Sequence, residues 1–327
     1  MGILTDTLNR TGGSGNDGVP KGIVPKAQFQ SATSLMASWR DEVLSSKPPT
    51  FYPIGDSDEL RRIEIGPGLV TLIGGAPGAG KTAFVMQAVI DALRLTPTLR
   101  AVVCNIEMPD DVLFERQLAR LSGVDLTTIR YRRLRAEHAE RVAIGVNTLD
   151  GVADRLAFVR PPFDLSNVAA AADENDAGLI VLDYIQRIQP PGEHSDKRGS
   201  VDATMSHLRA FADAGVAVVV LSAVARTKNK AGNSSYSGEG LNLASFRESS
   251  ELEFGADDAF ILTPDDKAEG EVILRHLKSR HGECRDLRMQ FDKPRQSFTP
   301  VDLLQTSGEV ETPVETSETE EGEPDES

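Results

Sequence analysis

The 327-residue chain has little cysteine and no long apolar run. Its two cysteines, Cys104 and Cys284, lie far apart, which argues against a disulfide framework and fits a reducing compartment. No apolar run approaches the ~18 residues that a membrane-spanning helix needs. The first residues also lack the basic segment and apolar core of a secretory signal. We therefore expect a cytoplasmic protein with no membrane segment.

Basic residues are also few: the chain has 35 Lys and Arg against 50 Asp and Glu, which gives a net charge of −15. Nine of the acidic residues fall in segment 309–327, which has no basic residue, so the rest of the chain carries −6. A mildly acidic body gives no sign of general nucleic-acid binding. It is still compatible with a ring that gathers basic loops in a central channel.

A phosphate-binding loop follows the first strong strand pattern, the apolar run 69–73. The pattern G-x-x-x-x-G-K-[ST] predicts a nucleotide site, with a helix over 81–95 behind it. The residues of this site are Gly75, Ala76, Pro77, Gly78, Ala79, Gly80, Lys81 and Thr82. Lys81 would bring positive charge to the β- and γ-phosphates of ATP, and the Thr82 hydroxyl would bind Mg²⁺. The alternative, a glycine-rich turn that fits by chance, is disfavoured by the strand before it and the helix after it.

Two carboxylates follow apolar strand patterns and are candidates for the chemistry. Asp183 ends the run 179–183, where nucleotide hydrolases hold their Mg²⁺ site; alone, such an aspartate caps a turn about as often. Glu107 lies at the end of the run 101–107 and could polarise an attacking water. It could equally be an N-terminal charge on a helix that begins at Pro109. For Glu107 the residues alone leave both interpretations open.

The composition predicts four parts along the chain. Residues 1–30 are rich in glycine and polar residues and predict a flexible leader. Segment 31–50 holds an amphipathic helix, which would fold back on its own domain or dock on a neighbour. Its apolar residues are Leu35, Met36, Trp39, Val43 and Leu44. Residues 51–305 form the main domain, and the acidic segment 306–327 predicts a disordered tail that could bind a protein partner.

Strand-like runs alternate with helical patterns in the main domain. The runs are 69–73, 100–105, 155–159, 178–183 and 216–222. This alternation predicts an α/β fold with a mostly parallel central sheet flanked by helices. Four more runs, at 259–262, 271–278, 287–291 and 297–301, predict an antiparallel C-terminal extension of the sheet.

Two long polar segments would emerge from the carboxyl edge of this sheet. Segment 189–200 carries Lys197 and Arg198. Segment 225–245 carries Arg226, Lys228 and Lys230. Loops of this length inside a domain are usually functional or mobile, although ordinary solvated loops are the simpler interpretation.

Four more patterns follow the phosphate loop in order. They are Asn105-Ile106-Glu107-Met108-Pro109, continued by 118–120 and 123–126; Asp183-Tyr184-Ile185-Gln186; the stretch 247–257; and Lys278-Ser279-Arg280-His281-Gly282. Together the five motifs resemble the ATPase domain of DnaB-type replicative helicases, a hexameric branch of the RecA-like P-loop NTPases. The resemblance covers residues 31–301.

The resemblance implies a role for each motif. Glu107 would orient the attacking water, while Thr82 and Asp183 would hold Mg²⁺. Lys278 and Arg280 would reach the γ-phosphate of a neighbouring subunit, so the active form would be a homo-oligomeric ring, a hexamer in this family. The helix in 31–50 would be the linker helix that docks on that neighbour. The loops with Lys197, Arg198, Arg226, Lys228 and Lys230 would line the channel and contact single-stranded DNA.

The chain also departs from the family pattern. From the 30 residues before the resemblance begins, we expect no counterpart of the family's N-terminal collar domain. Ala223 stands where the family has a glutamine that senses the γ-phosphate, and Ala76 replaces a loop arginine. Phe254 and Gly255 replace a polar Gln-Asp pair. These changes leave ATP binding and hydrolysis in place, and they favour a second hypothesis, an ATP-controlled assembly factor that does not unwind DNA.

Overall fold

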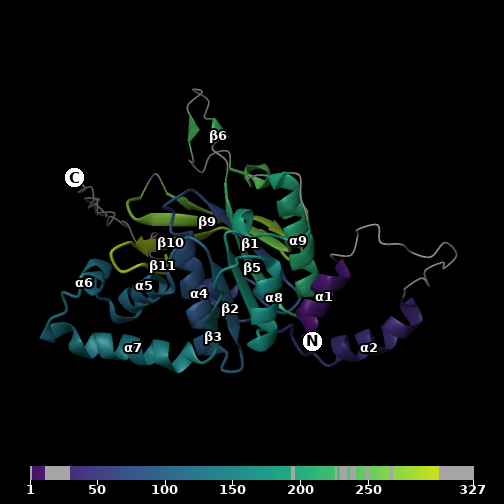
Figure 1. The fold of residues 1–327 in the computed structure, drawn as a ribbon, viewed down its shortest axis with the longest axis horizontal. Helices are drawn as coiled ribbons and strands as arrows, with labels where there is room; N and C mark the ends of the chain where they lie inside the picture. The colour runs from purple at the N-terminus through teal and green to yellow at the C-terminus, as the bar shows by residue number, and fades with distance from the viewer. Residues whose placement is uncertain are drawn as a thin grey trace, which may run out of the picture.

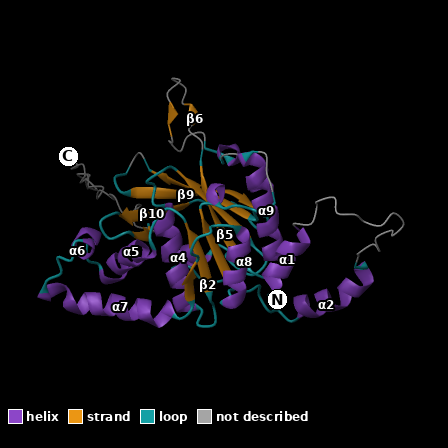
Figure 2. Cartoon of the chain, in the orientation of Figure 1, coloured by secondary structure: helices purple, strands orange, loops and turns teal. Residues whose placement is uncertain are grey.

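A computed structural model of the protein describes residues 2–11, 30–192, 196–224, 227–228, 234–235, 241–246, 251–265 and 268–301. Within them a central β-sheet carries helices on both faces (Figures 1 and 2). Its strands are β1 (Val70–Gly75), β2 (Ala101–Asn105), β3 (Leu156–Phe158), β4 (Leu179–Asp183), β5 (Ala217–Ala223), β8 (Asp258–Pro264), β9 (Glu271–Ser279), β10 (Leu287–Asp292) and β11 (Ser297–Pro300). The longer helices are α1 (Ile3–Thr11), α2 (Ala32–Leu44), α4 (Lys81–Leu95), α5 (Asp110–Ser122), α7 (Ala139–Ala153), α8 (Leu165–Glu174) and α9 (Lys197–Asp213). Short elements are α3 (Asp58–Arg61), α6 (Leu126–Arg130), α10 (Glu251–Gly255) and a hairpin of β6 (Thr227–Lys228) and β7 (Ser234–Ser235).

The sheet confirms the predicted α/β class. Its strand order is β11-β10-β9-β8-β1-β5-β4-β2-β3. The strands from β3 to β1 pair in parallel, and β9, β10 and β11 add antiparallel strands at the other edge. One detail of the prediction is wrong, because β8 pairs in parallel with β1 and the antiparallel extension begins only at β9. A run of apolar residues does not reveal strand direction, so the sequence could not show this.

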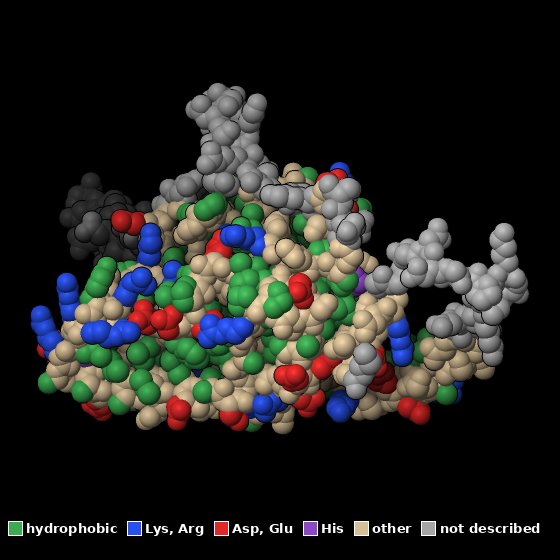
Figure 3. Space-filling model, in the orientation of Figure 1, with side chains coloured by type: hydrophobic (Ala, Val, Ile, Leu, Met, Phe, Trp, Pro, Cys, Tyr) green, Lys and Arg blue, Asp and Glu red, His purple; other side chains and the backbone are tan. Residues whose placement is uncertain are grey.

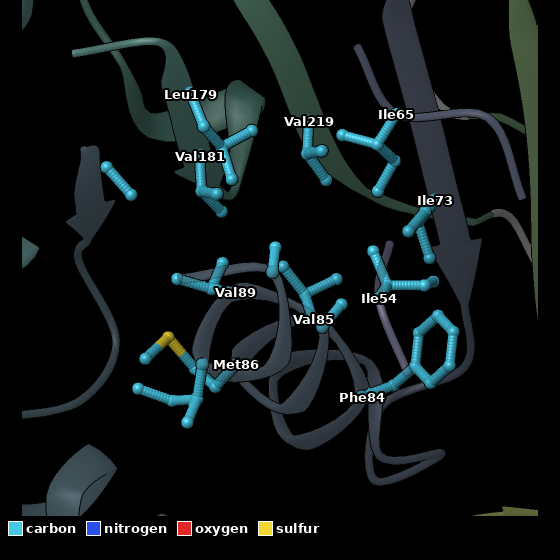
Figure 4. Close-up of a cluster of buried hydrophobic side chains, with 14 of the residues drawn as sticks. Ile54, Ile65, Ile73, Phe84, Val85, Met86, Val89, Leu179, Val181 and Val219 are labelled. Atoms are coloured by element: carbon cyan, nitrogen blue, oxygen red, sulfur yellow. The ribbon is translucent and has the colours of Figure 1, made fainter. Parts of the chain in front are cut away.

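Alternating side chains of the central strands divide the core into two layers. In β5, Val219 faces the layer of α4, whereas Val218 and Val220 face the layer of α8 and α9. Figure 4 shows Phe84, Val85 and Val89 of α4 pointing into the first layer, opposite side chains of β1, β4 and β5. Because both faces are covered, the parallel strands are apolar almost throughout, which is why their sequence pattern was readable.

Helix α1 differs from the flexible leader that the sequence predicts for residues 1–30. Leu4 and Leu8 are 3% and 4% exposed and join the core layer of α8 and α9. The segment is held by contacts with residues more than 150 positions away, which no local pattern could reveal. The prediction is therefore wrong for residues 3–11, and residues 12–29 lie outside the described part of the chain.

Helix α2 confirms the amphipathic helix predicted within segment 31–50. It has no buried residue, and Leu35, Met36, Trp39, Val43 and Leu44 are exposed. Figure 1 shows the helix leading away from the body of the domain. Of the two placements that the sequence left open, folding back onto its own domain is therefore not the one observed. No helix among the described residues is both long and apolar enough to cross a membrane.

The amide of Gln87 fastens the edge strand β11 to α4, and its loss should destabilise the fold. Gln87 Nε2 donates to the Phe298 carbonyl at 2.8 Å, and Gln87 Oε1 accepts from the Phe298 N–H at 2.9 Å. We expect Gln87→Ala to lower the free energy of unfolding by about 1–3 kcal/mol, because two buried backbone groups lose their partner. Urea denaturation measures this. Gln290→Ala, at an exposed position of β10, is the control and should change stability little; equal effects would contradict the argument.

Candidate active site

The phosphate loop joins β1 to α4 and needs glycine for two different reasons. Gly78 and Gly80 have φ angles of 77° and 93°, in the left-handed region that favours glycine. Gly75 has an ordinary φ, but a Cβ there would lie 2.7 Å from the Leu262 carbonyl oxygen. The tight loop therefore depends on turning at two positions and on close packing against β8 at the third. Gly80 caps α4, so the positive end of the helix dipole faces the cleft.

Lys81 extends back over the loop that precedes it. Its Nζ donates to the carbonyls of Gly75 at 2.8 Å and Ala76 at 3.0 Å. Burial lowers the pKa of Lys81, while the carboxylates of Asp183 and Glu107 act in the opposite direction. The ammonium group is thus partly desolvated, and an anion in the loop would gain more from it than from a solvated lysine.

Asp183 links α4 to the middle of the sheet. Its Oδ2 accepts hydrogen bonds from Thr82 Oγ1 at 2.6 Å and from Asn105 Nδ2 at 2.7 Å. Asn105 and Asp183 are paired at the carboxyl ends of β2 and β4, so the sheet fixes their relative position. Burial raises the pKa of Asp183 to about 6; the Thr82 hydrogen bond lowers it, Glu107 raises it, and Lys81 lowers it. The carboxylate is therefore held ionised at neutral pH against a cost of desolvation.

Glu107 lies two residues beyond the end of β2, because that strand ends at Asn105 rather than at Glu107. Asn105 Oδ1 accepts the backbone N–H groups of Glu107 at 3.0 Å and Met108 at 2.8 Å and so shapes the turn. Helix α5 begins just after Pro109, close to the start that the sequence predicts. Glu107 lines the same cleft as the phosphate loop, which places it beside Lys81, Thr82 and Asp183.

The cleft has a volume of about 470 Å³ and contains residues that the sequence analysis missed. These are the lining residues Arg116, Phe291, Lys293 and Gln296, together with Met108 and Tyr184, which belong to motifs but were given no role. Asn105, also a motif residue without an assigned role, contacts Asp183 through its side chain. Among the described residues the buried Nε of Arg116 has no hydrogen-bond partner. Burial and nearby Arg130 lower the pKa of Arg116, which Asp183 partly offsets. In the sequence, Arg116 is marked only by its position nine residues after Glu107. An arginine at that position is common in any helix, so nothing in the sequence assigned Arg116 to the site.

Lys278 and Arg280 do not reach this cleft. Ser279, between them, pairs with Asp258 at the amino end of β8, whereas Gly75 pairs with Leu262 nearer its carboxyl end. The separation along the strand is roughly 13 Å. Lys278 Nζ donates to the carbonyls of Glu253 and Ala256, both at 2.6 Å. Arg280 pairs with Asp257 at 2.8 Å and donates to the Phe254 carbonyl at 3.0 Å. Within one chain, the two cations are therefore bound away from the phosphate loop.

The basic residues expected to contact nucleic acid are described only in part. Lys197 begins α9, and Arg198 lies exposed in its first turn. Lys228 lies in β6, whereas Arg226 and Lys230 fall outside the described residues. The segment before α9 follows β4 and the hairpin follows β5, so both leave the carboxyl edge of the sheet. Residues 247–250, the start of one motif, also lie outside the described part.

Comparison with known proteins identifies the family of this chain. The model of the DnaB-like helicase C-terminal domain matches residues 65–300. The chain belongs to this family. It is 24% identical over 254 residues to the replicative DNA helicase DnaB of Geobacillus stearothermophilus, covering 74% of this chain and 54% of that protein. It is 26% identical over 266 residues to that of Pasteurella multocida, covering 76% and 54%. The chain thus spans about half the length of these relatives.

Solved structures agree on the fold. A structure of an ATPase domain is similar with a TM-score of 0.72 and 18% identity, and the match covers 84% of this chain and 100% of that one. A DnaB-like replicative helicase, studied with its interactions with primase, matches with a TM-score of 0.72 and 16% identity, over 85% of this chain and 68% of that one. The RecA-like fold expected from the motifs is therefore confirmed.

Removing the charge of Asp183 should stabilise the protein in the absence of nucleotide. The pKa is about 6 in the folded protein and near 3.8 in the unfolded chain, so the folded state keeps its proton longer as pH rises. Folding stability therefore falls between these pH values, and the loss is complete above about pH 6. We expect Asp183→Asn to raise the free energy of unfolding at pH 7.5 by about 1–3 kcal/mol, with no gain below pH 4.

Urea denaturation of the nucleotide-free protein at both pH values measures this effect. Asp150→Asn, at an exposed position of α7, is the matched control and should show no such pH dependence. A lower stability of Asp183→Asn at pH 7.5 would mean that the hydrogen bonds from Thr82 and Asn105 outweigh the desolvation of the carboxylate.

Proposed function

We propose that this chain is the ATPase motor of a ring-forming helicase, which couples Mg²⁺-dependent ATP hydrolysis to movement along single-stranded DNA. The observation that supports this most directly is the meeting of Lys81, Thr82, Glu107 and Asp183 in one cleft of a DnaB-family domain. We place its action in the cytoplasm. The relatives are named as replicative DNA helicases, and the chain covers about half of their length.

The residues present fit a magnesium nucleotide. Glycine-rich backbone, the dipole of α4 and Lys81 suit a polyphosphate, and a hydroxyl beside a carboxylate suits Mg²⁺, which keeps several waters and takes few protein ligands. When bound, the metal would neutralise charge on the phosphates. Thr82 and Asp183 would hold it, Lys81 would orient the phosphates, and Glu107 would hold the attacking water through its carboxylate. Arg116 would face the same phosphates from α5.

The distance of Lys278 and Arg280 from the phosphate loop of their own chain supports an oligomer. If these cations stabilise charge on a transferred phosphoryl group, that group must belong to another copy, because their own loop is roughly 13 Å away along the strand. Such a contact is head-to-tail, and it closes into a ring when the rotation between copies is a fraction of a full turn. By family resemblance we propose six subunits.

Two exposed apolar surfaces suit contacts between such copies. One is the apolar stripe of α2. The other is the region of α6 and α7, where Tyr131, Leu134, Ile144 and Val146 are each exposed. Figure 3 shows apolar side chains gathered over the part of the molecule where Figure 1 places α5 to α7. Surfaces of this kind usually mark interaction sites. We propose that α2 docks on a neighbouring copy.

DNA would bind at the carboxyl edge of the sheet. Arg198 is exposed there, and the segments with Lys197, Arg226, Lys228 and Lys230 start from the same edge. A few cations and backbone N–H groups suffice to follow a strand without reading its sequence. The acidic segment 306–327, outside the described residues, would serve as a protein-binding tail.

A specific observation also favours the second hypothesis, an ATP-controlled assembly factor. Ala223 lines the cleft but offers only its backbone, and its N–H donates to Gln186 Oε1 at 3.3 Å. Gln186 also donates to Ser222 Oγ at 2.7 Å. Position 223 thus has no side-chain donor for a γ-phosphate, which would weaken the link between hydrolysis and loop movement. Strand displacement on a forked duplex separates the two hypotheses, since only a motor displaces the strand.

Glu107→Gln should stop hydrolysis and keep nucleotide binding. The amide preserves size but cannot polarise water as a carboxylate does, so we expect kcat to fall about 10²–10⁴-fold. Affinity for a fluorescent ATP analogue should stay within about threefold, since the phosphate contacts are unchanged. ATP hydrolysis is measured with and without single-stranded DNA, which should stimulate the unsubstituted chain. Glu140→Gln, on the exposed side of α7, is the control. An active enzyme that ignores DNA would rule out the motor.

Complementation between two inactive variants tests whether Arg280 acts on another subunit. Lys81→Ala removes the phosphate contact, and Arg280→Ala removes the cation that would reach the neighbour. In random mixed rings, about a quarter of interfaces join an intact Lys81 to an intact Arg280, so roughly a quarter of the activity should return. Arg285→Ala, an exposed arginine nearby, should be active alone. No recovery in rings that native mass spectrometry shows to be mixed would place the action of Arg280 within its own subunit.

A further inference from the structure

Helix α1 packs in a groove of its own chain, where two of its leucines are buried. The groove is formed by α8 and α9, and Figure 1 shows α1 lying against these two helices. Leu4 and Leu8, one helical turn apart, insert into the apolar layer beneath. Asn9 and Arg10, in the last turn of the helix, are exposed. Two leucines at this spacing are the contact pattern of a helix bound in a groove.

Asp173, near the end of α8, receives the first turn of α1. Its Oδ1 accepts from the Leu4 N–H at 3.0 Å, and its Oδ2 accepts from the Thr5 N–H at 2.9 Å and from Thr5 Oγ1 at 2.6 Å. These are backbone donors that a helix cannot satisfy itself, and the carboxylate also meets the positive end of the helix dipole. A Cβ built on Gly2 would overlap the Asp173 carboxylate, so the approach requires glycine there.

The pKa of Asp173 is lowered, as expected for a carboxylate that accepts these hydrogen bonds. Partial burial acts to raise the pKa of Asp173, but the hydrogen bonds from Thr5 and from the Leu4 and Thr5 backbone outweigh it and lower the pKa. A helix of nine residues is not stable alone in water. The helical form of α1 therefore depends on the groove, and α1 and the groove behave as a ligand and its receptor.

The path of the chain shows which copy can supply the ligand. Residues 12–29 connect α1 to α2, and these eighteen residues span at most about 60 Å. This connection leaves the carboxyl end of α1 and reaches α2 at its amino end, which is the end of α2 that lies farther from the central sheet (Figure 1). If α2 docks on a neighbouring copy, the connection starts on that neighbour, and the neighbour's groove becomes a local site for α1.

We propose that in the assembled protein α1 docks in the α8–α9 groove of a second copy, so that this groove is an interaction surface between subunits. The proposal rests on the ring described above. The contacts are the same within one chain and between chains, which makes the exchange a form of domain swapping at low cost. Each α1 would add a tether between neighbours to the contacts of α2 and of the nucleotide cleft.

Cross-linking in a mixture of isotope-labelled and unlabelled chains tests whether α1 docks on a second copy. The residues of α1 that contact the groove are left unchanged. A photoreactive amino acid replaces exposed Asn9, and ¹⁵N-labelled and unlabelled full-length chains are mixed, assembled with ATP and Mg²⁺ and irradiated. Mass spectrometry then identifies cross-links from α1 to peptides of α8 or α9. Exchange predicts that about half of these join a labelled and an unlabelled chain. Cross-links only within one isotope, in rings shown by native mass spectrometry to be mixed, would overturn the proposal and leave the ring intact. A chain that stays monomeric with ATP would overturn both.

A second measurement uses two variants with complementary defects. Leu8→Asp weakens binding from the side of α1, because it places a charge in the apolar layer. Asp173→Lys weakens binding from the side of the groove, because its positive charge opposes the dipole of α1. We expect each alone to need a roughly tenfold higher concentration to assemble, a loss of about 1.4 kcal/mol. Mixing them should lower that concentration again, because α1 of Asp173→Lys fits the groove of Leu8→Asp.

The matched controls are Asn9→Asp on the exposed side of α1 and Glu174→Lys beside the receptor, and both should assemble like the unsubstituted chain. If α1 docks only within its own chain, mixing restores nothing. Normal assembly of both Leu8→Asp and Asp173→Lys would also contradict the proposal.

Discussion

The buried carboxylate of Asp183 is the point on which the arrangement of the cleft depends. It joins Thr82 at the start of α4 to Asn105 at the end of β2, and it stands itself at the end of β4. The sheet register that pairs Asn105 with Asp183 thus also positions the phosphate loop. A charge held in this place at neutral pH costs stability, since burial raises its pKa to about 6. Groups kept under such strain are typical of sites where a cation or a reacting group completes the coordination.

Much of the fold could be predicted because its signals are local. The parallel strands are buried on both faces, so each appears as an apolar run, and α4 begins where the loop motif requires. Helix α1 could not be predicted, because it is held by contacts with Asp173 and α9, which lie far away in the sequence. The direction of β8 also escaped prediction, because it depends on pairing with β1 far along the chain.

In the candidate active site, too, only the residues with a local sequence signal could be predicted. Lys81, Thr82, Glu107 and Asp183 were predictable because a motif names each one, and the structure brings all four to one cleft. Arg116 and Phe291 could not be found in this way. Arg116 is one of several arginines on or near α5, and only its burial beside Asp183 distinguishes it. Phe291 reaches the cleft because it stacks on Phe298, with ring centroids 4.2 Å apart, against the glycine that caps α4.

Strand β1 connects the two regions that the proposed mechanism uses. Its carboxyl end continues into the phosphate loop, and at its amino end the Val70 N–H donates to Asp257 Oδ2 at 2.8 Å. Asp257, 2% exposed, also pairs with Arg280 and with Arg209 of α9. A neighbour's phosphate would therefore compete with Asp257 for the guanidinium of Arg280. Withdrawal of that cation would leave Asp257 with Arg209, the Val70 N–H and, at 4.0 Å, His281 Nε2. Occupancy of one copy's cleft would in this way be linked to β1 and α9 of the next copy, even though Ala223 provides no side-chain sensor within the cleft itself.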